Sequence, residues 1–415
     1  MLINYLKIAW KVLGRNRFFT FISLFGISFT LMILLVITSF LSHLLGENYP
    51  EDKRDRSLYV MRSVMRNTKQ NGQMTGPISA YFVINYLKKM QTPEKVAFMS
   101  FVPNNVNTFV GNKKLSLFAK YTDAEFWNVL NFRFIEGKPY QTNQVTNSEK
   151  VVVITEDTRR QYFGEGVSAV GKYININNES YRISGVVKEV PITRIHVSSD
   201  VYMPYTHDKI NLKNLEYNGR YCAILLASTS ADVPKMRAEF DNMAAKLPLP
   251  DPKSFDKLII HADDFIDGML RNFTGIDEES PRDYFMRIGA IFAFLFMLLP
   301  AVNLINVNIS RILERSSEIG VRKAFGASSP HLVLQFIVEN IAITFIGGLI
   351  GFVGAGLVVY IINNSGLIPY GDLTINFTVL ATGLTLCLLF GVLSGVYPAF
   401  RMSRLHIVKA LKAGE

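Results

Sequence analysis

The sequence predicts a membrane protein with four transmembrane α-helices and a large α+β extracytoplasmic domain of two subdomains, inserted between the first and second helices. Three observations lead to this fold class. Hydrophobic residues make up 49% of the 415 residues and charged residues only 19%, a balance too apolar for an ordinary soluble protein. Four apolar runs are long enough to cross a bilayer. The polar stretch between the first two runs is long enough to form a whole domain.

The basic residues predict the orientation of the chain in the membrane. Although the net charge is +10, many of its basic residues gather in three clusters that flank apolar runs. The clusters are Lys7, Lys11, Arg15 and Arg17, then Arg311, Arg315, Arg322 and Lys323, and finally Arg401, Arg404, Lys409 and Lys412. Because cytoplasmic flanks carry the excess of Lys and Arg, both termini are predicted to be cytoplasmic. This placement argues against binding to nucleic acid, which would need a basic patch on a domain surface.

Residues 1–17 alternate apolar and basic side chains in the manner of an amphipathic elbow helix that lies on the inner membrane surface. Residues 18–45 form the first predicted transmembrane helix. A cleavable signal peptide is the alternative, because it also begins with basic residues and an apolar stretch. The run is longer than a signal core and has no clear small-residue cleavage site before Gly46, which favours an uncleaved anchor.

With the N-terminus inside, residues 46–282 are predicted to form the extracytoplasmic domain. Its two ends show a similar order of strand, helix and strand, and a third set of elements lies between them. The outer predictions are strand Ser57–Val64, helix Ile78–Met90, strand Val96–Val102, strand Tyr221–Ser228, helix Val233–Leu247 and strand Lys257–His261. The inner predictions are strand Val151–Ile154, helix Glu156–Phe163, and strands Tyr173–Ile176 and Tyr181–Val187 as a hairpin around Asn177–Asn178. The central elements would form a second subdomain.

One segment of the domain imitates a nucleotide-binding loop. Gly166, Gly171 and Lys172 have the spacing of a phosphate-binding P-loop, but Tyr173 stands where a Ser or Thr must bind magnesium. The segment also precedes a strand rather than a helix. We therefore interpret it as a structural turn.

The domain shows no pattern typical of an enzyme. His196, His207 and His261 are scattered without the paired spacing of a metal-binding helix. The neighbours Asp263 and Asp264 are predicted to be exposed surface carboxylates, since acidic residues are seldom buried. Cys222 and Cys387, the only cysteines, lie in the domain and in the last apolar run, so no disulfide is expected between them.

Three further transmembrane helices are predicted at residues 284–310, 332–362 and 377–400. They are joined by a cytoplasmic segment at 311–330 and a short extracytoplasmic loop at 363–376, and a cytoplasmic tail follows at 401–415. The second helix carries Asn303, Asn306 and Asn308 near its inner end, and these amides are expected to face other helices or the interface. A polar substrate pathway is the alternative interpretation.

Small residues recur at intervals of four in the last two apolar runs. They are Gly347, Gly351 and Ala355 in the third run, and Gly383, Cys387, Gly391 and Gly395 in the fourth. Such faces allow helices to pack closely in lipid, where no hydrophobic drive brings them together. Glu339 is the only acidic residue within these runs. It is expected to form a structural ion pair with a base such as Arg401 or Arg404, with proton coupling as the alternative.

The cytoplasmic segment between the second and third runs carries a charged stripe. Arg311, Glu314, Arg315, Glu318 and Arg322 recur at spacings of three and four, so a helix would place them on one face. Gly320 and Gly326 would let a partner approach the backbone closely. A soluble partner could bind here. The alternative is a solvated loop that only obeys the charge bias of cytoplasmic flanks.

The motif E-R-S-S-E-I-G-V-R-K-A-F-G-A-S at residues 314–328 resembles the signature of MacB/FtsX/LolC-like permeases, the membrane subunits of one class of ABC transporter. In that family this segment is the coupling helix that docks into the ATP-binding subunit. The resemblance implies a docking role for Glu314, Arg315, Glu318, Ile319, Gly320, Arg322 and Gly326.

The resemblance extends over essentially the whole chain. It includes I-A-W-K-V-L-G-R-N-R at 8–17, F-I-E-G-K-P at 134–139, Y-F-G at 162–164, G-K-Y-I-N-I at 171–176, Y-R-I-S-G-V-V-K-E-V-P at 181–191 and V-Y-P-A at 396–399. The domain motifs resemble the periplasmic core domain of MacB-type permeases, whose subdomains are called porter and sabre. This implies a porter-like part at 46–105 and 221–282 and a sabre-like part at 106–220.

The resemblance implies a multi-pass permease of the inner membrane, with its large domain in the periplasm. It would export a periplasmic substrate such as an antibiotic or peptide by transmitting mechanical work across the membrane. No valid P-loop occurs in this sequence, so ATP and magnesium are expected in a separate ATP-binding subunit, and no cofactor or metal is expected in this chain. Further expected partners are a second permease, like or unlike, membrane lipid, a periplasmic adaptor and an outer-membrane channel.

Three other functions remain open at this stage. A lipoprotein-releasing permease would have the same topology. A signalling permease of the FtsX kind, which controls cell-wall hydrolases, usually has a smaller external domain than the one predicted for this chain. A receptor of the sensor-kinase type would need a longer internal segment.

Overall fold

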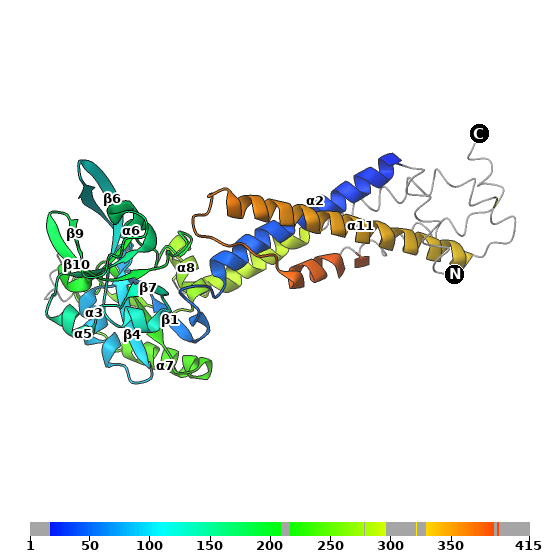
Figure 1. The fold of residues 1–415 in the computed structure, drawn as a ribbon. Coiled ribbons are helices and arrows are strands. Elements are labelled where there is room, and N and C mark those ends of the chain that lie inside the picture. The colour runs from blue at the N-terminus through cyan, green and yellow to red at the C-terminus, as the bar shows by residue number, and fades with distance from the viewer. Residues whose placement is uncertain are drawn as a thin grey trace. The chain divides into compact units, whose positions relative to one another are not determined.

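The computed structural model describes residues 17–208, 216–277, 279–295, 321, 329–385 and 388–389. They fall into two compact units, which we describe separately. The helical unit takes its described residues from the first apolar run up to His43, from Phe285–Leu367 and from Asp372 onward. The α+β domain comprises Leu44–Tyr284 together with Ile368–Gly371. Figure 1 shows the elements of both in chain order by colour.

The helical unit contains two helices that are long and apolar enough to cross a membrane, among the residues that the structure describes. They are α2 (Arg17–Leu45) and α11 (Ser329–Asn364). Shorter described helices cover residues 281–295 and 377–385, within the second and fourth predicted spans. Residues 1–16, 296–320, 322–328 and 390–415, which include the predicted elbow helix, most of the coupling segment and the tail, lie outside the described residues.

Small residues bring α11 close to α2. A Cβ atom on Gly347 would lie 2.9 Å from the Ile27 side chain, and one on Gly351 would lie 2.7 Å from the Ser28 carbonyl oxygen. Ile27, Leu31 and Ile343 are buried together beside these glycines. Because lipid gives no hydrophobic drive for association, this close backbone approach supplies the van der Waals contact that holds the two helices together.

The domain is built on one mixed ten-stranded sheet. Its strand order is β1-β12-β4-β6-β11-β8-β10-β7, with β5 added beside β6 and β9 beside β10. The strands are β1 (Ser57–Val60), β4 (Lys95–Ser100), β5 (Asn104–Val110), β6 (Lys113–Thr122), β7 (Phe134–Gly137), β8 (Val151–Thr155), β9 (Tyr173–Ile176), β10 (Glu179–Val187), β11 (Val201–Pro204) and β12 (Tyr221–Leu226). Among the described strands of this sheet, the β6–β11 and β8–β10 pairs are parallel. All other pairs of this sheet are antiparallel.

The ten-stranded sheet runs through both predicted subdomains. The strands of the porter-like part meet those of the sabre-like part where Met99 of β4 pairs with Thr122 of β6. The division predicted between residues 105 and 106 falls inside β5. Backbone pairing between strands therefore joins the two parts, which the sequence pattern did not reveal.

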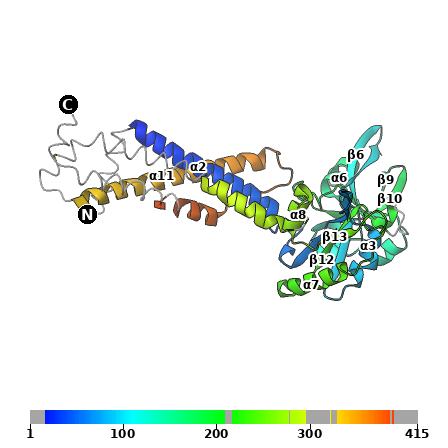
Figure 2. The same cartoon turned by 180° about the vertical axis from the view of Figure 1, so that it is seen from behind.

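Apolar clusters cover both faces of the β1-β12-β4 end of this sheet. One cluster packs helices α3 (Ala80–Asn85) and α7 (Val233–Ala244) against one face, and the other packs α4 (Phe126–Val129) and α8 (Phe265–Thr274) against the opposite face. Figures 1 and 2 show α7 at the lower edge of the domain in both views. Near β8 and β10, the partly buried rings of α6 (Glu156–Phe163) cover a third cluster. The remaining short elements are α5 (Thr142–Thr146) and 3-10 turns at Arg54–Arg56, Leu87–Lys89, Tyr205–His207 and Ser230–Asp232.

A second, three-stranded antiparallel sheet has the order β13-β2-β3. Its strands are β2 (Arg62–Asn67), β3 (Gly72–Pro77) and β13 (Lys257–Ile260). The single strand predicted over Ser57–Val64 is wrong, because the chain leaves the large sheet at Met61 and enters this one. Buried residues lie on both sides of the break, so the apolar pattern continues through it. The predicted helix Ile78–Met90 is likewise two pieces, α3 and the 3-10 turn at Leu87–Lys89.

Several local predictions in the central part are confirmed. α6 has the predicted bounds, and the Thr155 hydroxyl caps its N-terminus by accepting a bond from the Thr158 N–H. Strands β9 and β10 form a hairpin around Asn177 and Asn178, whose φ angles of 48° and 68° suit a tight primed turn. The P-loop-like segment leads through Gly171 into β9, as expected for a structural turn.

Replacing Gly351 with Ala should weaken the α2–α11 contact by about 1 to 3 kcal/mol, because the new Cβ would meet a backbone oxygen that cannot rotate away. The matched control is Gly356→Ala on the same helix, where the nearest atom to a new Cβ lies 3.9 Å away. Thermal unfolding of the purified chain in detergent measures both. A Gly351→Ala melting temperature equal to that of the control would refute this packing role.

Candidate functional site

Two buried arginine clusters lie where the chain enters and leaves the domain. The entry cluster forms at the end of α2, whose last carbonyl groups have no partners within the helix. Arg54 donates from Nη1 to the oxygens of Leu45 and Gly46 at 3.1 and 3.0 Å, and Arg194 donates from Nη2 to Gly46 O at 2.9 Å. Positive charge also favours the negative end of a helix dipole. These arginines therefore bind the carbonyl groups of Leu45 and Gly46 at the start of the domain.

Glu51 neutralises the entry cluster. Its carboxylate pairs with Arg54 and lies 3.5 Å from Arg194 Nη1, and the three side chains are at most 4% exposed. The Tyr59 hydroxyl donates to Glu51 Oε1 at 3.3 Å, and the Phe265 ring lies 3.3 Å below the Arg54 guanidinium. Burial and the Glu51 charge raise the pKa of Tyr59 well above its ordinary value. Burial, followed by the Arg54 charge, lowers the pKa of Arg194 to about 10.

His196 and Lys120 extend this buried polar region. The Lys120 ammonium donates to Ser100 O at 3.1 Å and Phe101 O at 3.4 Å, and burial lowers its pKa to about 8. The His196 ring packs 5.1 Å from the Phe101 ring. Burial and the nearby Lys120 charge lower the pKa of His196 to about 4. His196 is therefore neutral in the folded protein at neutral pH.

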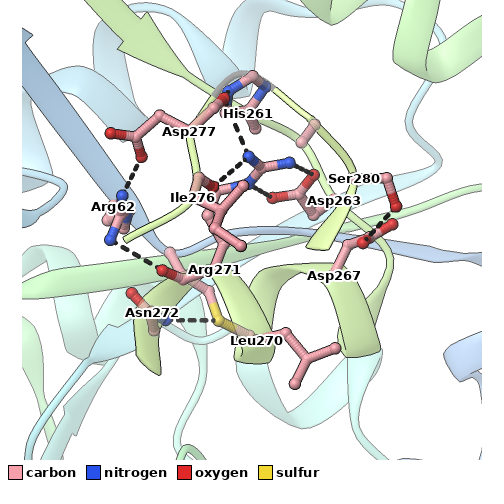
Figure 3. Close-up of polar contacts among 12 residues, drawn as sticks. Arg62, His261, Asp263, Asp267, Leu270, Arg271, Asn272, Ile276, Asp277 and Ser280 are labelled. Atoms are coloured by element: carbon pink, nitrogen blue, oxygen red, sulfur yellow. Dashed lines mark hydrogen bonds and ion pairs between the residues drawn. The ribbon is translucent and has the colours of Figure 1, made fainter. Parts of the chain in front are cut away.

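The exit cluster centres on Arg271 of α8 (Figure 3). Its guanidinium forms a two-point contact with Asp263, at 2.8 and 3.2 Å. Arg271 Nη1 also donates to the carbonyl oxygens of Ile276, Asp277 and Glu279 at 2.8, 3.0 and 3.2 Å. One buried side chain thus holds the segment that leads from the domain to the helix at residues 281–295.

Further contacts fix the same exit segment. The Asp277 carboxylate pairs with Arg62 and with Arg66, and Arg62 also donates to Arg271 O at 2.9 Å. The His261 ring lies 2.8 Å from Asp277 O (Figure 3). Asp267 accepts bonds from Ser280 Oγ and from the Arg282 N–H, at 2.8 and 2.9 Å. The last bond places a carboxylate at the N-terminus of the following helix, where the helix dipole favours negative charge.

The prediction that Asp263 and Asp264 are exposed surface carboxylates is wrong for Asp263, whereas the Asp264 side chain is 35% exposed. Asp263 is 5% exposed and bound to Arg271, and Asp264 caps α8 by accepting from the N–H groups of Ile266 and Asp267. The entry and exit clusters were missed because their partners are far apart in sequence. One signal was available for Arg54, because a basic residue soon after the outer end of a span runs against the usual charge bias.

The structure places only some of the residues predicted as functional. Glu314, Arg315, Glu318, Ile319, Gly320, Arg322 and Gly326 lie outside the described residues, as do Asn303, Asn306, Gly391 and Gly395. Gly347 and Gly351 face α2, a Cβ on Gly383 would lie 2.8 Å from Leu31, and Ala355 is fully buried. Glu339 is 3% exposed. The bases Arg401 and Arg404 proposed to pair with it are not described.

Two family models together match most of this chain. The model of the MacB-like periplasmic core domain matches residues 20–243, and the model of the FtsX-like permease C-terminal region matches residues 290–407. The chain belongs to the MacB/FtsX-like permeases. This MacB/FtsX-like permease is therefore a membrane protein with a large extracytoplasmic domain.

Curated relatives of this MacB/FtsX-like permease include transport proteins. The pyoverdine export ATP-binding/permease protein PvdT of Pseudomonas syringae pv. syringae is 25% identical over 99% of this chain and 59% of its own length. The uncharacterized ABC transporter permease YknZ of Bacillus subtilis is 24% identical over 82% of this chain and 86% of its own length. The macrolide export ATP-binding/permease protein MacB of Wolinella succinogenes is 23% identical over 99% of this chain and 61% of its own length.

This chain spans 59% of the length of the PvdT relative. Among solved structures, the periplasmic region of MacB from Actinobacillus actinomycetemcomitans aligns with a TM-score of 0.37 and 16% identity, over 52% of this chain and 93% of that one.

Substituting Glu51 with Gln should destabilise the domain of this permease by about 3 to 5 kcal/mol, because Arg54 and Arg194 would remain buried without their counter-charge. Trp127, buried in the adjacent core, provides the fluorescence signal for unfolding in urea. The matched control is Glu179→Gln, since the Lys150–Glu179 pair is about half exposed and should contribute about 0 to 1 kcal/mol. Equal effects of the two substitutions would contradict the role of Glu51.

The neutral state of His196 should make the domain sensitive to acid. The folded pKa of about 4 lies below the ordinary value of 6.5, so the unfolded chain binds a proton first as the pH falls. The contribution of His196 is complete above pH 6.5 and is lost between pH 6.5 and 4, by about 3 kcal/mol. In His196→Phe this part of the pH dependence of the unfolding free energy should vanish. Parallel curves for wild type and variant would show that His196 has no such role.

Proposed function

We propose that this chain is the transmembrane subunit of an ABC exporter. It couples ATP hydrolysis by a separate ATP-binding subunit to movement of its extracytoplasmic domain, which acts on a periplasmic substrate. In this proposal four helices cross the inner membrane, both termini are cytoplasmic, and the permease works as a dimer. A periplasmic adaptor and an outer-membrane channel complete the route.

The observation that carries this proposal is the anchoring of the domain at both of its connections to the transmembrane helices. Flexible linkers would absorb a movement of the helices before it reached the domain. Here Arg54 and Arg194 hold the entry at Leu45 and Gly46, and Arg271 holds the exit at three carbonyl oxygens. Buried ionic contacts at both ends of the domain support a route by which a displacement of the chain at either connection would reach the domain.

In the proposed cycle, closure of two ATP-binding subunits displaces the segments at residues 311–330. The displacement passes along the second and first transmembrane helices to the arginine clusters. The extracytoplasmic domains then change their separation and drive the substrate onward, while the permease itself provides no catalytic group. Export is favoured over lipoprotein release and over signalling to cell-wall hydrolases because two of the relatives are named for export.

The partner interaction is tested by co-purification of this chain with the ATP-binding protein encoded nearest to it. Glu318→Arg combined with Gly320→Leu should abolish capture of that protein, because the substitutions reverse a charge and block close backbone approach. The ATP hydrolysis measured in the purified sample should be lost with it. Glu165→Arg, a change at a side chain that is 81% exposed in the domain, should leave capture unchanged. Capture by the double variant at the wild-type level would overturn the docking segment, and absence of capture by wild type would overturn the transporter assignment.

A further inference from the structure

The domain contains an apolar pocket that takes no part in anchoring the transmembrane helices. Its volume is about 240 Å³, and it lies between the start of α6, strand β6, the loop that precedes β11 and the segment with Pro369 and Tyr370, which belongs to the domain. Its apolar lining includes Phe118, Val190, Ile192 and Ile195. Ile192 and Ile195 are 58% and 46% exposed, which makes the surroundings of the pocket apolar as well.

Three carboxylates, Asp157, Glu189 and Asp200, line the same pocket. Glu189 is only 8% exposed, and one of its oxygens accepts a bond from the Asp157 N–H. Asp200 accepts from the Phe118 N–H through Oδ2 at 2.8 Å. The second oxygen of Glu189 and of Asp200 has no hydrogen bond to any residue that the structure describes. Each carboxylate can therefore still accept a bond from a ligand.

The charge of this pocket is not balanced from within. None of the described residues that line it is a Lys, Arg or His. Asp157 already contacts Arg160 at 3.4 Å and Gln161 at 2.7 Å, so it is less available than the other two carboxylates. Burial, with the Asp157 charge, raises the pKa of Asp200. A positive group in the pocket would offset the cost of burying the Asp200 carboxylate and the repulsion between its charge and that of Asp157.

We propose that this pocket binds the ammonium group of a cationic amphiphile. Glu189 and Asp200 accept bonds from the ammonium group, and the apolar part of the ligand packs on Val190, Ile192 and Ile195. A neutral or anionic amphiphile would leave buried negative charge without a partner, so the pocket discriminates by charge. The inference deepens the proposed function, because it names the class of substrate that the exporter would recognise.

The test uses the full chain in phosphatidylcholine nanodiscs and 2-(1-naphthyl)ethylamine as the probe. Saturable binding is measured by saturation-transfer NMR against empty nanodiscs, with the neutral analogue 2-(1-naphthyl)ethanol in parallel. Wild type should bind the amine at least about tenfold more tightly than the alcohol, because a bond to a charged group is lost with the alcohol. Equal affinities for the two compounds, or no saturable amine binding beyond empty nanodiscs, would overturn the inference.

Two isosteric variants locate the site. Glu189→Gln and Asp200→Asn retain an oxygen that can accept from the Asp157 and Phe118 N–H groups, and each should weaken amine binding about tenfold. Asp251→Asn, at an exposed carboxylate outside the pocket, should leave binding unchanged. Trp127 fluorescence checks that each variant is folded. Wild-type amine affinity in both pocket variants would also overturn the inference.

Failure of the amine-binding test can be distinguished from failure of the proposed transporter function. Capture of the ATP-binding protein does not depend on Glu189 or Asp200. Normal capture without amine binding would refute only the pocket, and amine binding without capture would refute only the transporter assignment.

Discussion

The structure of the domain depends on the requirement that buried charges and helix ends find partners. The carbonyls at the end of α2 have no donors within the helix, and water has little access to the cluster around Glu51. Arg54 and Arg194 supply the donors, and Glu51 compensates their charge. The same physical requirement is met at the exit by Arg271 and Asp263. Because each arginine binds several groups at once, no connection can shift alone without leaving a charge or carbonyl unsatisfied.

The continuous sheet adds a second constraint on movement within the domain. Its two parts are joined through β4 and β6, and the Lys120 side chain of β6 also donates to two carbonyls at the end of β4 and just beyond it. Backbone pairing and a buried ammonium group thus resist separation of the two parts. The entry and exit clusters therefore lie in a domain whose two parts are joined by backbone pairing and by a buried side chain.

Local elements were predictable where short-range chemistry decides them. Helix α6 follows a capping Thr155, and the β9–β10 hairpin turns at two asparagines that tolerate positive φ. The membrane character followed from the apolar composition and the length of the apolar runs. The break at Met61 could not be predicted, because β1 before it and β2 after it both contain buried apolar residues. The apolar pattern therefore does not show that the two strands belong to different sheets. The pairing of Arg271 with Asp263 and of Arg194 with Glu51 depends on the tertiary fold, which residue spacing does not encode.

The small sheet ends at β3, a strand whose composition has a consequence for the behaviour of the protein among its neighbours. An open strand edge can recruit a strand from another chain and so start aggregation. β3 contains Gly72 and Gly76 and ends at Pro77, and most of its residues are exposed. Glycine weakens strand addition and proline cannot donate a ladder bond. The edge is thus a poor template for intermolecular pairing, which limits aggregation of the domain through this strand.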